Sequence, residues 1–129
     1  MMLNELECTI LDESLNDLLV SIQEGIPHLK HTSPEDINKN TLAIVSAKMK
    51  LKKLPSDKNI EFTLQELKVM YWALSDLRET TVEYLDSAPL SDPYRSTAVD
   101  SQRICNRLLR SLRELFSQEG IDMLQVFPQ

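Results

Sequence analysis

Apolar residues recur at helical spacing in four separate stretches of the chain, and this pattern predicts an all-α fold. In the first stretch, about residues 3–24, they fall on one face of a helix that turns about 100° per residue. These residues are Cys8, Leu11, Leu15, Leu18, Leu19 and Ile22. Gly25 and Pro27 follow, as is common after a helix end. The chain has only two glycines, which argues against the tight turns of an all-β fold.

The second stretch begins at Ser33-Pro34 and ends before Pro55. Serine is a favourable N-cap, and proline suits the first position of a helix. A seam of coiled-coil type runs along this stretch, and it consists of Ile37, Ile44, Ala47, Leu51 and Leu54. Leu42, Val45 and Met49 form a second apolar strip, so we expect this helix to be buried on two sides.

The third and fourth stretches carry start and stop signals of their own. Thr63 and Glu66 have the spacing of a capping box, and the apolar pattern continues to about Ser87. The fourth stretch is expected to start near Asp92-Pro93 and to stop at Gly120. A short apolar tail follows at residues 121–127.

Four helices of about 20–25 residues, joined by short loops, predict an up-down-up-down antiparallel four-helix bundle with a short apolar C-terminal tail. The length of 129 residues fits a single helical domain over 1–129. One shared core should contain Leu15, Ile44, Leu74 and Leu108.

Charge and cysteine usage predict a cytoplasmic protein. The start of the chain is acidic and lacks the basic and apolar regions of a signal peptide, and no apolar run approaches the ~20 residues of a membrane span. The net charge is −6, which favours solubility. Two cysteines 97 positions apart do not form a disulfide framework.

Catalytic and metal-binding motifs are absent from the sequence. His28 and His31 are flanked by Glu24 and Glu35, but no Glu-x-x-His pair of the kind used by di-metal bundles occurs. Cys8 and Cys105 fall on predicted core faces, where cysteine acts as a small apolar residue. We therefore expect no metal, no cofactor and no catalytic residue, and an enzyme with an unrecognised site stays an alternative.

Basic residues gather in two places. Lys48, Lys50, Lys52 and Lys53 lie at the end of the second helix, where cations also suit the helix dipole. Arg103, Arg107 and Arg110 form a stripe opposite the predicted core face of the fourth helix. Lys48–Lys53 and this stripe leave open a nucleic-acid-associated regulator, although no aromatic residues interleave with them for base stacking.

Trp72 is the main candidate for an interface residue. On a helical wheel it lies about 160° from the core line of the third helix, beside Val69 and among acidic residues. An exposed tryptophan with an acidic rim is typical of an interface anchor, although the tail at residues 121–127 could cover it instead. We predict a helical protein-interaction or regulatory module that binds a protein partner or itself. Its interface candidates are Val69, Trp72, Arg103, Arg107 and Arg110.

Overall fold

The computed structural model describes residues 3–24, 33–54 and 60–120, and these form four α-helices without any strand. The helices are α1 (Glu5–Gln23), α2 (Pro34–Lys53), α3 (Leu64–Ser87) and α4 (Arg95–Gln118). The prediction of an all-α four-helix bundle is therefore confirmed. The predicted tail at residues 121–127 lies outside the described residues.

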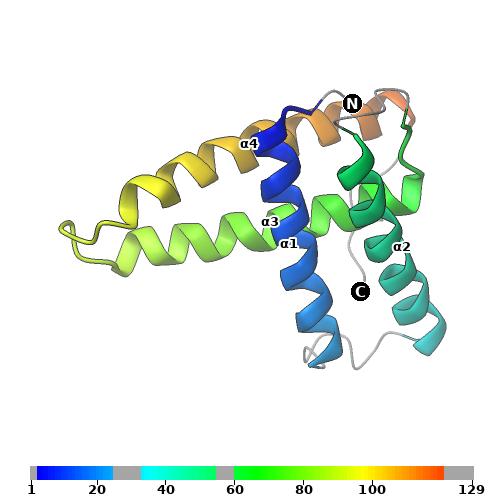
Figure 1. Cartoon of the computed structure of the whole chain (residues 1–129), viewed down its shortest axis with the longest axis horizontal. Helices are drawn as coiled ribbons and strands as arrows, with labels where there is room; N and C mark the ends of the chain where they lie inside the picture. The colour runs from blue at the N-terminus through cyan, green and yellow to red at the C-terminus, as the bar shows by residue number, and fades with distance from the viewer. Residues whose placement is uncertain (1–2, 25–32, 55–59, 121–129) are drawn as a thin grey trace.

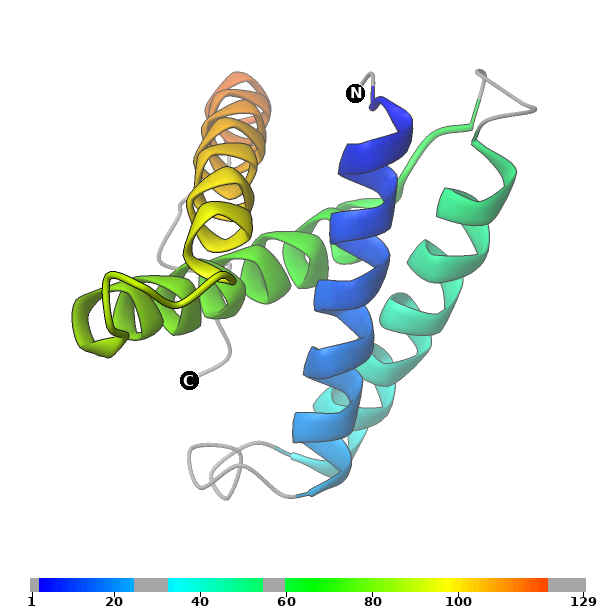
Figure 2. The same ribbon diagram turned by 60° about the vertical axis from the view of Figure 1, so that its left-hand side comes forward.

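The helices are arranged as two antiparallel pairs. α1 and α2 lie side by side, and α3 and α4 form the second pair (Figure 1). The first pair crosses the N-terminal half of α3 steeply, so the two pairs do not share one axis (Figure 2). The C-terminal end of α3 and the start of α4 project beyond this crossing as a free hairpin end.

The core draws on all four helices. Leu15, Ile44, Leu74 and Leu108 are all buried within one cluster, as the sequence predicts. α3 packs against each of the other three helices. Between residues 66 and 74 of α3, every residue except Lys68 is buried. This half of α3 is thus enclosed on most of its circumference.

Local sequence explains where three of the helices begin. The Ser33 hydroxyl accepts a hydrogen bond from the backbone N–H of Asp36, and Thr63 and Glu66 form the predicted capping box. Asn4 and Glu7 form a second capping box at the start of α1. Each cap satisfies backbone N–H groups that have no partner within the helix.

The predicted start of α4 near Asp92-Pro93 is two residues early. The helix begins at Arg95, after the N-cap Tyr94, and no side chain caps it. Asp92 instead accepts a hydrogen bond from the backbone N–H of Tyr94 within the loop. The Arg95 guanidinium donates to the carbonyls of Leu85 (2.9 Å) and Ala88 (3.0 Å), which ties the start of α4 to the end of α3.

The end of α4 agrees with the sequence. Gly120 has φ of +69°, in the left-handed region that glycine adopts without strain, directly after the helix. Across residues 3–24, 33–54 and 60–120, no helix has the length and hydropathy that crossing a bilayer requires.

Candidate interaction surface

The structure buries the two apolar candidates of α3. Trp72 is 5% exposed and Val69 is 1% exposed, and both belong to the core cluster. The expectation that they form an exposed patch is wrong. α3 packs against all three other helices, so a helical wheel with one core face does not describe it. The alternative expectation, that the tail at residues 121–127 covers Trp72, concerns residues outside the described ranges.

The arginine stripe of α4 is exposed, as predicted, but two of its members have acidic partners. The guanidinium of Arg103 lies 2.7 Å from Asp100, one turn earlier on the same helix. The guanidinium of Arg107 lies 3.2 Å from the Glu7 carboxylate and so links α4 to the start of α1. Arg110 is exposed on the same helix. Much of the stripe therefore serves contacts within the chain.

Two lysines of the run at the end of α2 form ion pairs within the described residues, and two do not. Lys48 lies 3.2 Å from the Asp12 carboxylate of α1, and Lys50 lies 2.6 Å from the Glu66 carboxylate of α3. Lys52 and Lys53 are exposed, and no carboxylate in the described residues forms an ion pair with either. Only the end of the run thus presents unpaired positive charge.

Glu66 is a buried carboxylate that accepts hydrogen bonds from α2 and from its own N-cap residue. One oxygen accepts from the Lys50 ammonium and from the backbone N–H of Thr63, and the other accepts from the Ser46 hydroxyl at 2.5 Å. Its side chain is 2% exposed. Burial by itself would raise the pKa of Glu66, but the hydrogen bonds from Lys50, Ser46 and Thr63 outweigh it and hold the pKa below its ordinary value.

The second apolar strip of α2 is exposed. Leu42 is 70% exposed, Val45 is 42% exposed and Met49 is 56% exposed. The prediction that this helix is buried on two sides is therefore wrong. Its coiled-coil seam fills the core through Ile44, Ala47 and Leu51, whereas the strip lies on the opposite side of the helix and faces solvent. We call Leu42, Val45 and Met49 the α2 strip.

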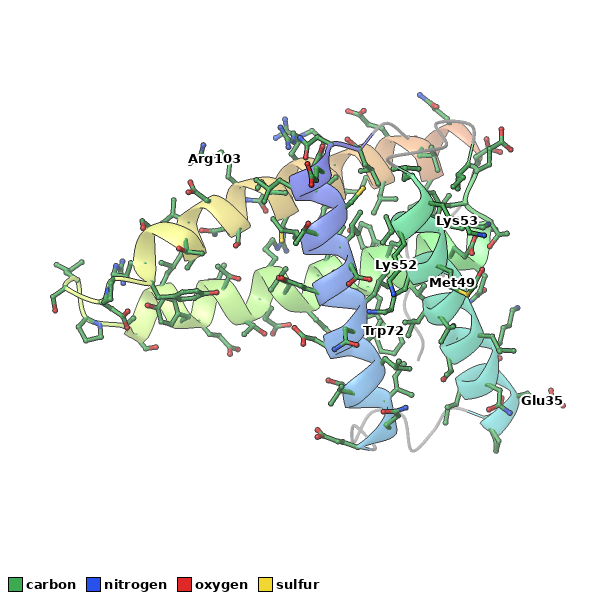
Figure 3. The ribbon with its side chains drawn as sticks, viewed as in Figure 1. Glu35, Met49, Lys52, Lys53, Trp72 and Arg103 are labelled. Atoms are coloured by element: carbon green, nitrogen blue, oxygen red, sulfur yellow. The ribbon has the colours of Figure 1, made fainter. Side chains whose placement is uncertain are left out.

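Charged residues stand at both ends of the α2 strip. Lys53 follows it and Glu35 precedes it, and both are exposed. These two residues are 18 positions apart, which is about five full helical turns, so they lie on the same side of α2. Figure 3 shows Glu35, Met49 and Lys53 projecting from that side, away from α1. Lys52 projects from the other side of the strip.

Two further features bear on chemistry. A pocket of about 240 Å³ between α1 and α3 is lined partly by Asp17, Asp76, Glu79 and Glu83. No group of three or more His, Cys, Asp or Glu among the described residues is arranged to hold a metal ion. His28 and His31 lie outside those residues.

Both cysteines are buried thiols. Burial raises the pKa of Cys105 to about 11, against a smaller opposing effect of Arg78. Burial and the nearby carboxylates of Glu7 and Glu5 raise the pKa of Cys8. The thiolate is the reactive form of cysteine, so the raised pKa values make both thiols poor nucleophiles.

Comparison of the chain with protein-family models, with curated proteins and with solved structures gave no match.

Proposed function

We propose that this protein is a non-catalytic helical interaction module whose α2 strip pairs with the apolar face of a helix from a protein partner. The observation that carries this proposal is the exposure of Leu42, Val45 and Met49 in one line along α2. Spacing of i, i+3 and i+7 is the pattern by which one helix docks against another.

The α2 strip is not required to close the core of the chain. Ile44, Ala47 and Leu51 already fill the core side of α2. Single apolar residues on a surface are ordinary, but several in a continuous line are typical of a binding site. Full burial of a Val, Leu or Met side chain contributes roughly 1.5–3 kcal/mol. Because these three side chains are still partly exposed, a partner helix that covers them would gain a corresponding fraction of that free energy.

The basic residues support nucleic-acid binding less well than protein binding. Lys48, Lys50 and Arg107 contact carboxylates on other helices, and Arg103 contacts one on its own helix. Binding of nucleic acid depends on cations that are free to replace the counterions of the phosphates. These members of the lysine run and the arginine stripe are therefore engaged within the chain.

Site-specific photocrosslinking tests the proposal. A photoreactive amino acid is placed at Met49 in the full chain and activated in cells, and the matched control position is the exposed Ser96 near the start of α4. We expect a discrete protein adduct from position 49 that position 96 does not give. Val45→Lys should abolish this adduct because it puts a charge in the middle of the strip.

Adducts that are equal at positions 49 and 96, or that persist in Val45→Lys, would contradict the proposal. Circular dichroism of Val45→Lys must match that of the original chain, so that loss of the adduct reports the surface and not the fold.

A further inference from the structure

We infer that the helix which pairs with the α2 strip is α2 of a second copy of this chain, antiparallel to the first and related to it by a two-fold axis near Val45. This inference rests on the proposed function and names its partner. The argument uses the order of side-chain sizes along the strip and the charges at its two ends.

The strip is self-complementary in size. Val45, the smallest of its three side chains, stands between Leu42 and Met49, and all three lie within about 60° of arc. A two-fold axis near Val45 places Leu42 of each copy against Met49 of the other. The two Val45 side chains then meet at the centre, where the helices approach most closely. An isologous contact of this kind closes as a dimer.

The end charges select the antiparallel orientation. Measured along the helix from the middle of the strip, Lys53 lies about 11 Å to one side and Glu35 about 16 Å to the other. In an antiparallel pair, Lys53 of one copy therefore lies within about 5 Å, along the axis, of Glu35 of the second copy, and on the same side. In a parallel pair, Lys53 of one copy and Glu35 of the other would lie at opposite ends of the contact, so this ion pair could not form.

Neither end charge is engaged elsewhere in the described part of the chain. No ion pair of Lys53 or Glu35 occurs among those residues, and both are exposed. The contact is small beside stable interfaces, which bury roughly 1,200–2,000 Å² in total. We therefore expect a dimer that dissociates on dilution.

Disulfide trapping tests both the partner and the orientation. Cysteine is introduced by Leu42→Cys, Val45→Cys or Met49→Cys in the full chain, which is then treated with oxidised glutathione. The native Cys8 and Cys105 are buried and do not compete. A disulfide requires Cα atoms about 4.4–6.8 Å apart, so only a residue near the two-fold axis can bond to itself.

We expect Val45→Cys alone to form a covalent dimer of twice the 14.8 kDa chain mass. Leu42→Cys and Met49→Cys should each remain largely monomeric alone and should form a dimer when mixed. Ser96→Cys, far from α2, is the control for random collision and should stay monomeric. Light scattering of the original chain should show its mass rising toward twofold with concentration, and Val45→Lys should remove this rise.

Two results would overturn the inference. Equal self-trapping by Leu42→Cys, Val45→Cys and Met49→Cys would indicate a parallel pair. A chain that stays monomeric at every concentration, with no trapping at Val45→Cys above the Ser96→Cys control, would exclude self-pairing. If the chain is monomeric, a photoadduct of position 49 with a different polypeptide would leave the proposed function standing. The absence of any adduct would contradict both the self-pairing and the proposed function.

Discussion

Glu66 both caps α3 and binds two residues of α2, and the sequence predicts only the cap. Its spacing from Thr63 predicts a helix cap, and the structure confirms that cap. The same carboxylate also binds Ser46 and Lys50, which lie 20 and 16 residues away on α2. The second role depends on which side of α2 faces α3, and the local pattern around Glu66 holds no information on this. A capping residue thus also fastens α2 to α3.

We expect Glu66→Gln to destabilise the fold by about 1–3 kcal/mol, because it removes the charge that balances Lys50 and weakens three hydrogen bonds. Lys50 is partly exposed and can be hydrated, which keeps the cost below that of a fully buried broken pair. Urea unfolding measures the change. Glu61→Gln is the control, since its side chain is exposed, and a change as large as that of Glu66→Gln would contradict this account.

The same residue should make stability depend on pH. The folded-state pKa of Glu66 lies below its ordinary value of 4.5, so its stabilising effect is fully present above about that pH and is lost as the pH falls through the folded-state value. We expect the difference in unfolding free energy between the original chain and Glu66→Gln to shrink as the pH falls below 4.5. A constant difference from neutral to strongly acidic pH would show that the charge of Glu66 does not contribute.

The two thiols should react slowly in the folded chain. At pH 8 the raised pKa values of Cys8 and Cys105 leave little thiolate, and burial excludes a bulky reagent. Cys105 should be the slower of the two, since it is fully buried. Mass spectrometry of a timed maleimide reaction checks this, with the urea-unfolded chain as the reference for full labelling. Complete labelling of Cys105 within minutes under native conditions would contradict its place in the core.

α2 shows the limit of periodicity as a guide to burial. Its two apolar strips are both helical in spacing, and the sequence predicts that both are buried. The structure buries the strip with Ile44 and exposes the strip with Val45. A helix contacts only as many neighbours as the fold supplies, and α2 packs against α1 and α3 on one side. Which apolar face is covered is therefore a property of the assembled fold.

The neighbouring residues Ile44 and Val45 provide a matched pair for this difference. We expect Ile44→Ala to cost about 2–5 kcal/mol, as truncations of a buried aliphatic side chain do. Val45→Ala should change stability by less than about 0.5 kcal/mol at concentrations where the chain is monomeric. Thermal unfolding of both variants in dilute solution makes the comparison, and similar losses for the two would place Val45 in the core as well.

Helix boundaries were predictable wherever a short-range cap determines them. Ser33 and the pair Thr63 and Glu66 cap their helices as their spacing predicts. The capping box of Asn4 and Glu7 follows the same rule and could have been found in the same way. The start of α4 at Arg95 follows no such rule, since no side chain caps it. The Arg95 guanidinium instead donates to carbonyls near the end of α3, 7 and 10 residues earlier, and the local sequence does not show this contact.

The bundle as a whole was predictable in its helices and its core, but not in the angle between its two pairs. Hydrophobic periodicity indicates which face of a helix is buried, but it does not indicate the direction of the helix that packs against that face. Trp72 is buried although it lies opposite the expected core line of α3. The steep crossing leaves the hairpin end of α3 and α4 outside it, with few buried residues after Leu74 on α3. The molecule thus has an enclosed part and a projecting part.

This division should be measurable along the single helix α3. Backbone amides between residues 66 and 74 lie under the crossing, whereas those from 82 to 87 lie in the projecting end. Local opening is governed by how much packing must be broken, so we expect hydrogen exchange to be slower by an order of magnitude or more in the first group. Arg95→Ala removes the bonds to Leu85 and Ala88 and should speed exchange only in the projecting end. Lys52→Ala is the matched control, since Lys52 is exposed on α2 and should change neither group. Uniform protection along the whole of α3, or an equal effect of Arg95→Ala on residues 66–74, would mean that the helix opens as one unit and that the crossing does not divide it.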